Sequence, residues 1–205
     1  MIAASKQYIT RLTPNFNGWR KPSGLEGKCK SSNPMNKLFE EIHGFGWEEW
    51  LFHFIEDTDG YCYGFLQCFN RRKIKSKFIN TVHLYTRLRN DGNKVNSKET
   101  HTFYVGRIDQ LEVLGNEHNE LIKNLVSNNE KMMKKSLSEA GIKNSDKLFD
   151  KIKSENKIFN VRFKKASARM MTSLGKKIKL PHGYYRFKLY DITTKNEFIK
   201  SLTNQ

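Results

Sequence analysis

Residues 17–24, with the sequence NGWRKPSG, bring one large aromatic ring together with two cations, a hydroxyl group and two glycines. Trp19 is suited to stacking on a base, whereas Arg20, Lys21 and backbone N–H groups are suited to binding phosphate oxygens. Ser23 offers a further hydrogen bond. The segment therefore predicts a contact with an extruded base or its phosphate. The alternative is an ordered surface loop whose tryptophan packs against the fold.

Residues 44–52, with the sequence GFGWEEWLF, place two carboxylates between two tryptophans, next to a glycine-rich turn. The rings of Trp47 and Trp50 could sandwich a base, and Glu48 or Glu49 could accept a hydrogen bond from an exocyclic amine or a ring N–H. The alternative is that residues 50–52 are core and that the acids face water. Trp47 follows a glycine on an expected loop, so it has less reason to be buried.

Two basic tracts with interleaved aromatic residues, at 71–78 and 162–179, are typical of a surface that follows a phosphate backbone. In a strand, such a tract would present cations on one face and pack the other face against the fold. A lysine-rich face that contacts only water is the usual alternative for any single tract. The predicted backbone contacts are Lys21, Arg71, Arg72, Lys73, Lys75, Lys77, Lys164, Lys165, Arg169, Lys176, Lys177 and Lys179.

The charge of the chain supports a polyanionic partner. Its 205 residues include 37 Lys and Arg against 21 Asp and Glu, a formal net charge of +16. The excess is concentrated in residues 117–205, which carry 20 basic and 9 acidic residues. Such a balance favours nucleic acid first and an anionic membrane surface second. We therefore expect a nucleic-acid partner and no membrane.

Familiar catalytic and metal-binding patterns are missing. The sequence has no GxxxxGK[S/T] loop and no GxGxxG fingerprint. Its three cysteines, Cys29, Cys62 and Cys68, form no CxxC pair, and its six histidines show no HExxH spacing. We therefore expect no metal, no cofactor, no catalytic residue and no enzymatic activity. A metal-dependent nuclease of unrecognised type is the remaining enzymatic alternative.

The sparse, odd set of cysteines also argues against a disulfide framework and for a reducing compartment. No apolar run approaches the roughly 20 residues that span a bilayer, and the first residues lack the apolar centre of a signal peptide. These observations predict a cytoplasmic protein.

The elements that must position these residues are predicted to be strands followed by helices and further strands. Alternating, β-branched or aromatic runs indicate strands at 8–13, 61–69, 76–88, 102–113, 158–163 and 184–192, with a hairpin turn at 91–93. Helical periodicity at 117–154 indicates one helix that ends at Gly141 and a second that begins at Asn144 or Ser145. We expect one α+β domain over residues 1–205, with a basic helical insertion at about 117–154.

Three segments, residues 18–24, 44–52 and 59–67 (DGYCYGFLQ), resemble the N-terminal domain that precedes nuclease or ATPase modules in bacterial modification-dependent, type IV-like restriction proteins. Residues 104–108 and 159–163 fit the same pattern. The resemblance extends to the PUA-like superfamily, which includes the EVE and YTH readers of modified bases. It implies a partly open, mixed β-barrel flanked by helices, with a pocket for an extruded base. The partner implied by the resemblance is duplex DNA that carries a modified base.

The same resemblance implies a base pocket formed by Trp19, Arg20, Ser23, Trp47, Glu48, Glu49, Trp50, Tyr61 and Tyr63. One departure concerns Trp47, because the family pattern usually has histidine there, which leaves the preferred base open. In the family the reader is joined to a nuclease or a motor, so cleavage would come from a fused or separate partner. An RNA-binding module of the same fold is the runner-up interpretation.

Overall fold

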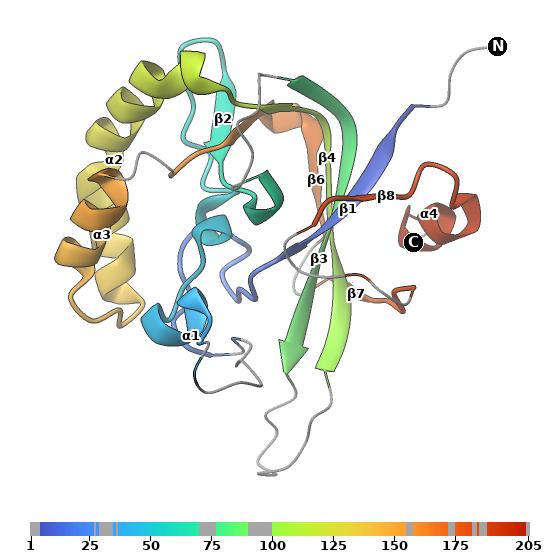
Figure 1. Cartoon of the computed structure of the whole chain (residues 1–205), viewed down its shortest axis with the longest axis horizontal. Coiled ribbons are helices and arrows are strands. Elements are labelled where there is room, and N and C mark those ends of the chain that lie inside the picture. Colours follow the sequence, from blue (N-terminus) through green and yellow to red (C-terminus); the bar gives the residue numbers. More distant parts are fainter. Residues whose placement is uncertain are drawn as a thin grey trace.

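A mixed sheet of eight strands forms the centre of the fold (Figure 1). The computed structural model describes residues 5–26, 28, 35, 37–69, 77–89, 100–154, 158–171, 175–181, 184 and 188–203. The strand order is β2-β5-β4-β3-β1-β8, and β6 and β7 also pair with β4. The strands are β1 (Gln7–Leu12), β2 (Tyr61–Gly64), β3 (Lys77–Arg89), β4 (Thr100–Val113), β5 (Val161–Lys164), β6 (Ala168–Met170), β7 (Lys176–Lys177) and β8 (Tyr190–Asp191).

The long hairpin of β3 and β4 forms the centre of this sheet, and its pairing confirms the predicted hairpin. The strands run antiparallel from the pair Lys77–Val113 to the pair Arg89–Thr100, with one register shift next to Leu84. The predicted turn at 91–93 lies outside the described residues. On the free edge of β3, β1 pairs in parallel, and β8 then pairs antiparallel to β1.

The other edge of β4 is covered in turn by β5, β6 and β7, all antiparallel to it. The basic segment 164–179, which lies between the strands expected at 158–163 and 184–192, supplies two short strands, β6 and β7. Gly106 permits this close approach, because its φ is +148° and a Cβ there would overlap the carbonyl oxygen of Arg169. Neither strand has the apolar alternation that would have revealed it in the sequence.

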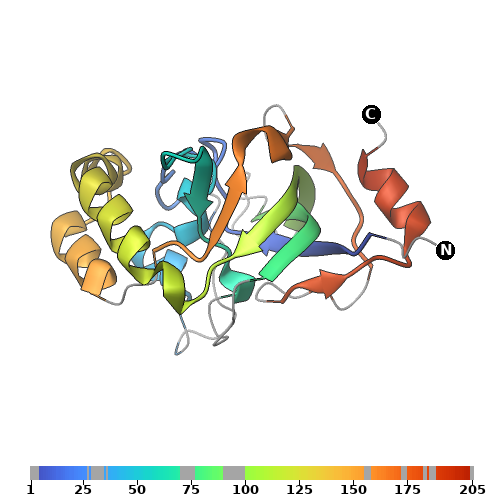
Figure 2. The ribbon, with the colours of Figure 1, turned by 90° about the horizontal axis from the view of Figure 1, so that it is seen from above.

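Among the described residues, four α-helices accompany the sheet: α1 (Phe39–His43), α2 (Asn119–Glu139), α3 (Ser145–Ser154) and α4 (Asn196–Thr203). Figures 1 and 2 show α2 and α3 side by side at one end of the molecule and α4 at the opposite end. The predicted apolar stripe of α2 faces inward, with Ile122, Val126, Met133 and Leu137 buried. The chain leaves α2 at Gly141, whose φ is +71°, as predicted.

Comparison with the predicted elements confirms the α+β class, but the sheet does not close into a barrel. The strand expected at 61–69 ends at Gly64, and a short 3-10 helix occupies Gln67–Phe69. Among the described residues of the strand expected at 184–192, the pair Tyr190–Asp191 is in a strand. Within the part of the chain that is described, no helix has the length and apolarity to cross a membrane.

Candidate nucleic-acid interface

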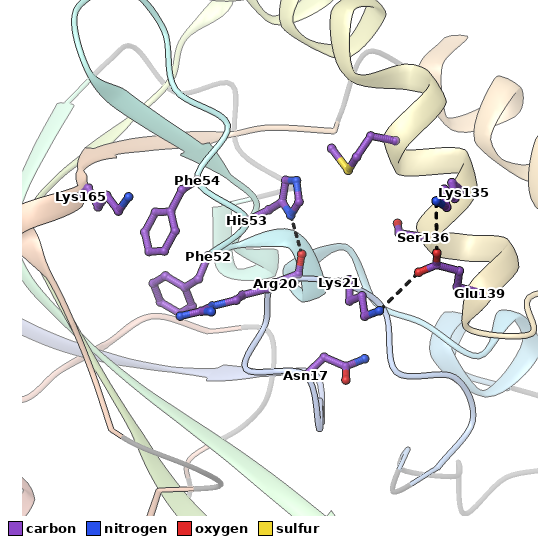
Figure 3. Close-up of a pocket in the computed structure, with 11 residues that line it drawn as sticks. Asn17, Arg20, Lys21, Phe52, His53, Phe54, Lys135, Ser136, Glu139 and Lys165 are labelled. Atoms are coloured by element: carbon purple, nitrogen blue, oxygen red, sulfur yellow. Dashed lines mark hydrogen bonds and ion pairs between the residues drawn. The ribbon is translucent and has the colours of Figure 1, made fainter.

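A groove of about 720 Å³ lies between the loop at residues 17–21, the segment at 52–54 and α2 (Figure 3). An adjoining part of the surface, with a volume of about 530 Å³, shares Asn17, Arg20, Phe52 and Phe54 with this groove. Because these four residues line both, we treat the two as one surface and call it the Arg20 groove. Its volume is in the range that accommodates a small organic ligand.

The Arg20 groove is basic. Four cations line it, Arg20, Lys21, Lys135 and Lys165, against one carboxylate, Glu139. Glu139 lies 3.3 Å from the Nζ of Lys21 and 3.8 Å from that of Lys135, so it offsets part of their charge. No described residue accepts a hydrogen bond from the Arg20 guanidinium. That group therefore keeps its five donors free for an anionic or acceptor-rich ligand.

Aromatic side chains supply the other half of the groove. Phe52 is buried, whereas Phe54 is only partly buried, with the Nζ of Lys165 5.0 Å from its ring centroid. The neighbouring His53 is held by its Nδ1, 2.8 Å from the carbonyl oxygen of Arg20 (Figure 3). An aromatic face beside cations is the combination that proteins use to bind bases and their phosphates.

Backbone strain is concentrated at this groove. Trp19 has a φ of +56° and Phe54 a φ of +59°, values that cost bulky residues about 1–3 kcal/mol each. The two strained segments are tied together, because the backbone N–H of Phe52 donates to the carbonyl oxygen of Trp19 at 2.9 Å. Strain of this kind persists only where the surroundings enforce it, and it is common at functional sites.

The carboxylate of Glu49 holds several of these segments in place. Its carboxylate is fully buried and lies 2.8 Å from the Nζ of Lys28, whose side chain is 2% exposed. The same carboxylate accepts hydrogen bonds from the backbone of Gly46, from the Asn15 amide and from both the N–H and the hydroxyl group of Ser23. It therefore joins the 44–52 motif to the 17–24 loop.

Asn15 extends this network into the loop. Its side-chain oxygen accepts the N–H groups of Asn17 and Trp19 at 2.7 and 2.8 Å, and its amide nitrogen donates to the carbonyl oxygen of Lys21. The loop that carries Arg20 thus folds around Asn15, which is held by Glu49. Sequence analysis did not single out Asn15 or Lys28, because nothing in their neighbourhood marks them as partners of a residue more than 20 positions away.

Glu48 and Glu49, predicted to read the edge of a base, are enclosed by protein instead of facing the groove. Glu48 accepts the hydroxyl group of Thr13 at 2.6 Å and the backbone N–H of Gln67 at 3.4 Å. Burial raises the pKa of the Glu48 carboxyl above its usual value, and the Thr13 hydrogen bond opposes that rise. Both carboxylates are placed to hold the surrounding loops in position.

The three tryptophans take different places. Trp19 is buried but borders the Arg20 groove, and its indole N–H donates to the carbonyl oxygen of Thr13 at 2.8 Å. Trp50 is buried and donates to the hydroxyl group of Ser136 on α2 at 3.1 Å. Trp47 is partly buried among aromatic rings and is not among the residues that line the Arg20 groove. Its aromatic neighbours are Phe39, Phe45, Trp50 and Phe65.

Tyr61 and Tyr63, predicted to lie in the base pocket, are on β2, away from the Arg20 groove. Tyr61 lies beneath two cations, with Arg162 4.4 Å and Lys164 3.9 Å from its ring centroid. Tyr63 is buried and donates to Asp57 at 2.7 Å. Burial is the largest cause of the rise in the Tyr63 pKa to about 12. Of the predicted pocket residues, the structure brings only Trp19 and Arg20 to the groove.

The predicted phosphate contacts are dispersed over the surface. Lys21 and Lys165 line the Arg20 groove. Lys164 and the exposed Arg169 lie beyond it on β5 and β6, while the Lys176 ammonium donates to the carbonyl oxygen of Ser201 on α4. Lys77, Lys177 and Lys179 are exposed, and Arg71, Arg72, Lys73 and Lys75 lie outside the described residues. Lys135, which lines the groove, was missed because the sequence shows it only as one of many lysines on a helix.

Within the described residues no three His, Cys, Asp or Glu side chains converge as metal ligands would. Cys62 and Cys68 are free thiols and are buried. Burial raises the pKa of the Cys62 thiol to about 11, and nearby Glu56 adds to that rise, so the thiol is protonated at neutral pH.

No protein family matches this chain, and neither a curated protein nor a solved structure matches it.

Proposed function

We propose that this chain is a DNA-binding module that receives a modified base, extruded from the duplex, in the Arg20 groove. The observation that carries the proposal is the unpartnered guanidinium of Arg20 between the partly buried ring of Phe54 and the lysines of the groove. A net charge of +16 would draw the chain to a polyanion. The groove would then provide a specific contact within that general attraction.

The energetics of base extrusion suit such a groove. Unstacking and unpairing a base costs a few kcal/mol, least where the base is modified or mismatched. Stacking on an aromatic ring returns about 1–3 kcal/mol per base. Hydrogen bonds from a charged donor such as Arg20 add about 1.5–3 kcal/mol. Phe54 would supply the stacking surface, Arg20 the polar contact to the base or its phosphate, and Lys21, Lys135 and Lys165 the remaining phosphate contacts.

The resemblance of residues 18–24, 44–52 and 59–67 to the reader domain of modification-dependent restriction proteins supports the finer part of this proposal. On that basis we assign the chain a role in a restriction or defence system, with cleavage supplied by a nuclease or ATPase partner. The PUA-like assignment belongs to the same proposal. Under this assignment, the mixed sheet would be a barrel that is left open between its edge strands β2 and β8.

A binding panel tests the proposed function. We expect a short duplex with one modified cytosine or adenine to bind about tenfold more tightly than its unmodified counterpart, a difference of about 1.4 kcal/mol. Phe54→Ala is expected to remove that preference while leaving the affinity for the unmodified duplex nearly unchanged. Tighter binding of the matching RNA would favour an RNA-binding module instead. Equal affinity for all duplexes would refute modified-base recognition.

A further inference from the structure

A second hollow, of about 570 Å³, opens where the side-chain alternation of the central hairpin shifts. The buried residues Ile79 and Val82 on β3 are three positions apart instead of two, and the facing stretch of β4 has the same spacing. The shift leaves Asn80 and Gln110 both exposed. Gln110 has a φ of +52°, an unusual value for a non-glycine residue inside a strand.

This strain is informative because of where it recurs. Among the described residues, four that are not glycine have positive φ. Two of them, Trp19 and Phe54, border the Arg20 groove, and Gln110 lines the second hollow. The fourth is Asn144, beside the start of α3, and asparagine tolerates this conformation. The three positions other than Asn144 therefore all lie at one of the two hollows.

The lining of the second hollow has the chemistry of a base-binding site. Phe78 is 66% exposed, an unusual fraction for so large an apolar side chain, and Tyr61 stands at the same hollow. The Gln110 amide has no hydrogen-bond partner among the described residues, whereas the Asn80 amide donates to the hydroxyl group of Ser5 at 2.9 Å. A free amide offers both a donor and an acceptor to the edge of a base.

The electrostatics of the hollow permit an anionic ligand. Lys164 lies at its rim with its ammonium group over the Tyr61 ring. The one carboxylate of the lining, Asp109, is offset by Arg107 at 3.3 Å and by Arg169 at 3.9 Å. A phosphate near Lys164 would therefore meet a locally positive surface.

The two hollows are close along the chain. Lys164 lines the second hollow, and the next residue, Lys165, lines the Arg20 groove. We propose that the second hollow binds an unpaired nucleotide of the same DNA, with its base on Phe78 and its edge against the Gln110 amide. This proposal rests on the proposed function, because it assigns a second contact to the same ligand. It implies a preference for duplexes that carry a single-stranded segment.

The test compares a blunt duplex with the same duplex carrying a single-stranded extension, by fluorescence anisotropy at fixed salt. For the unaltered chain the extension should tighten binding about tenfold, the effect of stacking one base. Phe78→Ala should abolish that gain and leave the blunt duplex unaffected. Ile42→Ala, which removes a similarly exposed apolar side chain (57%) from α1, should leave the gain intact.

Gln110→Gly provides a second variant, which tolerates the positive φ and removes the side chain together with its amide. It should reduce the gain from the extension without lowering the melting temperature. A gain that survives in both variants would overturn the proposal. Arg20→Met separates it from the proposed function, because it should weaken both duplexes equally and leave the gain unchanged. If Arg20→Met leaves both affinities unchanged while Phe78→Ala abolishes the gain from the extension, the second hollow binds DNA and the Arg20 groove does not.

Discussion

Replacement of Glu49 by glutamine tests the network that we consider to hold the Arg20 groove together. One carboxylate oxygen faces Lys28 and the N–H of Gly46, and the other faces Asn15 and Ser23. An amide has only one acceptor oxygen, so either rotamer turns an NH₂ group toward existing donors. It also removes the negative charge that lies 2.8 Å from the buried Lys28 ammonium.

The expected loss of unfolding free energy is about 3–5 kcal/mol, the cost of breaking a buried ion pair by removing one partner. That is a large part of the about 5–15 kcal/mol that stabilises a typical domain. Urea unfolding followed by tryptophan fluorescence measures it directly, since Trp19, Trp47 and Trp50 all lie near the network. Adding Lys28→Met to the Glu49→Gln background should restore part of the loss, because the buried cation that faced the carboxylate is then gone.

Glu120→Gln is the matched control. Its carboxylate is 80% exposed and 2.6 Å from the Lys123 ammonium, so its loss should not change stability measurably. We also expect Glu49→Gln to weaken oligonucleotide binding, because Asn15 and the Arg20 loop depend on it. A stability loss for Glu49→Gln as small as that of Glu120→Gln would refute the description of this pair as a buried support.

Three further outcomes are expected. Burial lowers the pKa of His83 to about 4. Between pH 6.5 and pH 4 the unfolded chain therefore binds a proton at this histidine that the native chain does not, and the free energy of unfolding should fall by about 3 kcal/mol as the pH falls across that range. In urea titrations, His83→Gln should remove this pH dependence. Trp47→Ala should lower the melting temperature and weaken modified and unmodified duplexes together, because Trp47 packs among aromatic rings; selective loss of the modified duplex with an unchanged melting temperature would instead make Trp47 a base contact. If the four groove cations each neutralise one phosphate, log K should fall against log salt with a slope of about −3 to −4, and an affinity that is flat with salt would exclude phosphate contact.

The features that sequence analysis predicted correctly are those with local signals. The 77–113 hairpin follows from its two β-rich runs, and α2 follows from a stripe of apolar residues at helical spacing that ends at Gly141. By contrast, β6 and β7 form only because β4 offers them an edge, and nothing in their own residues requires a strand.

The candidate site was predicted in part for the same reason. The residue types of Trp19 and Arg20 indicated that the 17–24 loop could contact a base or its phosphate, and both residues border the groove. Glu49 was predicted to read the edge of a base, but its carboxylate is buried on Lys28 and on an asparagine 34 positions earlier, and neither contact has a signal in the local sequence. Lys135 completes the groove from a helix more than 100 residues away, and sequence spacing alone cannot report such a contact.

The most direct test of the central claim, that DNA binds in the Arg20 groove, is an anisotropy titration of one modified duplex with two charge-matched variants. Arg20→Met removes the unpartnered cation of the groove, and Lys200→Met removes an exposed cation from α4, at the opposite end of the molecule (Figure 1). We expect Arg20→Met to raise the Kd about 10- to 100-fold, the effect of a hydrogen bond to a charged group, and Lys200→Met to change it little. Equal, small losses in the two variants would show that binding is carried by overall charge and would contradict the assignment of the groove.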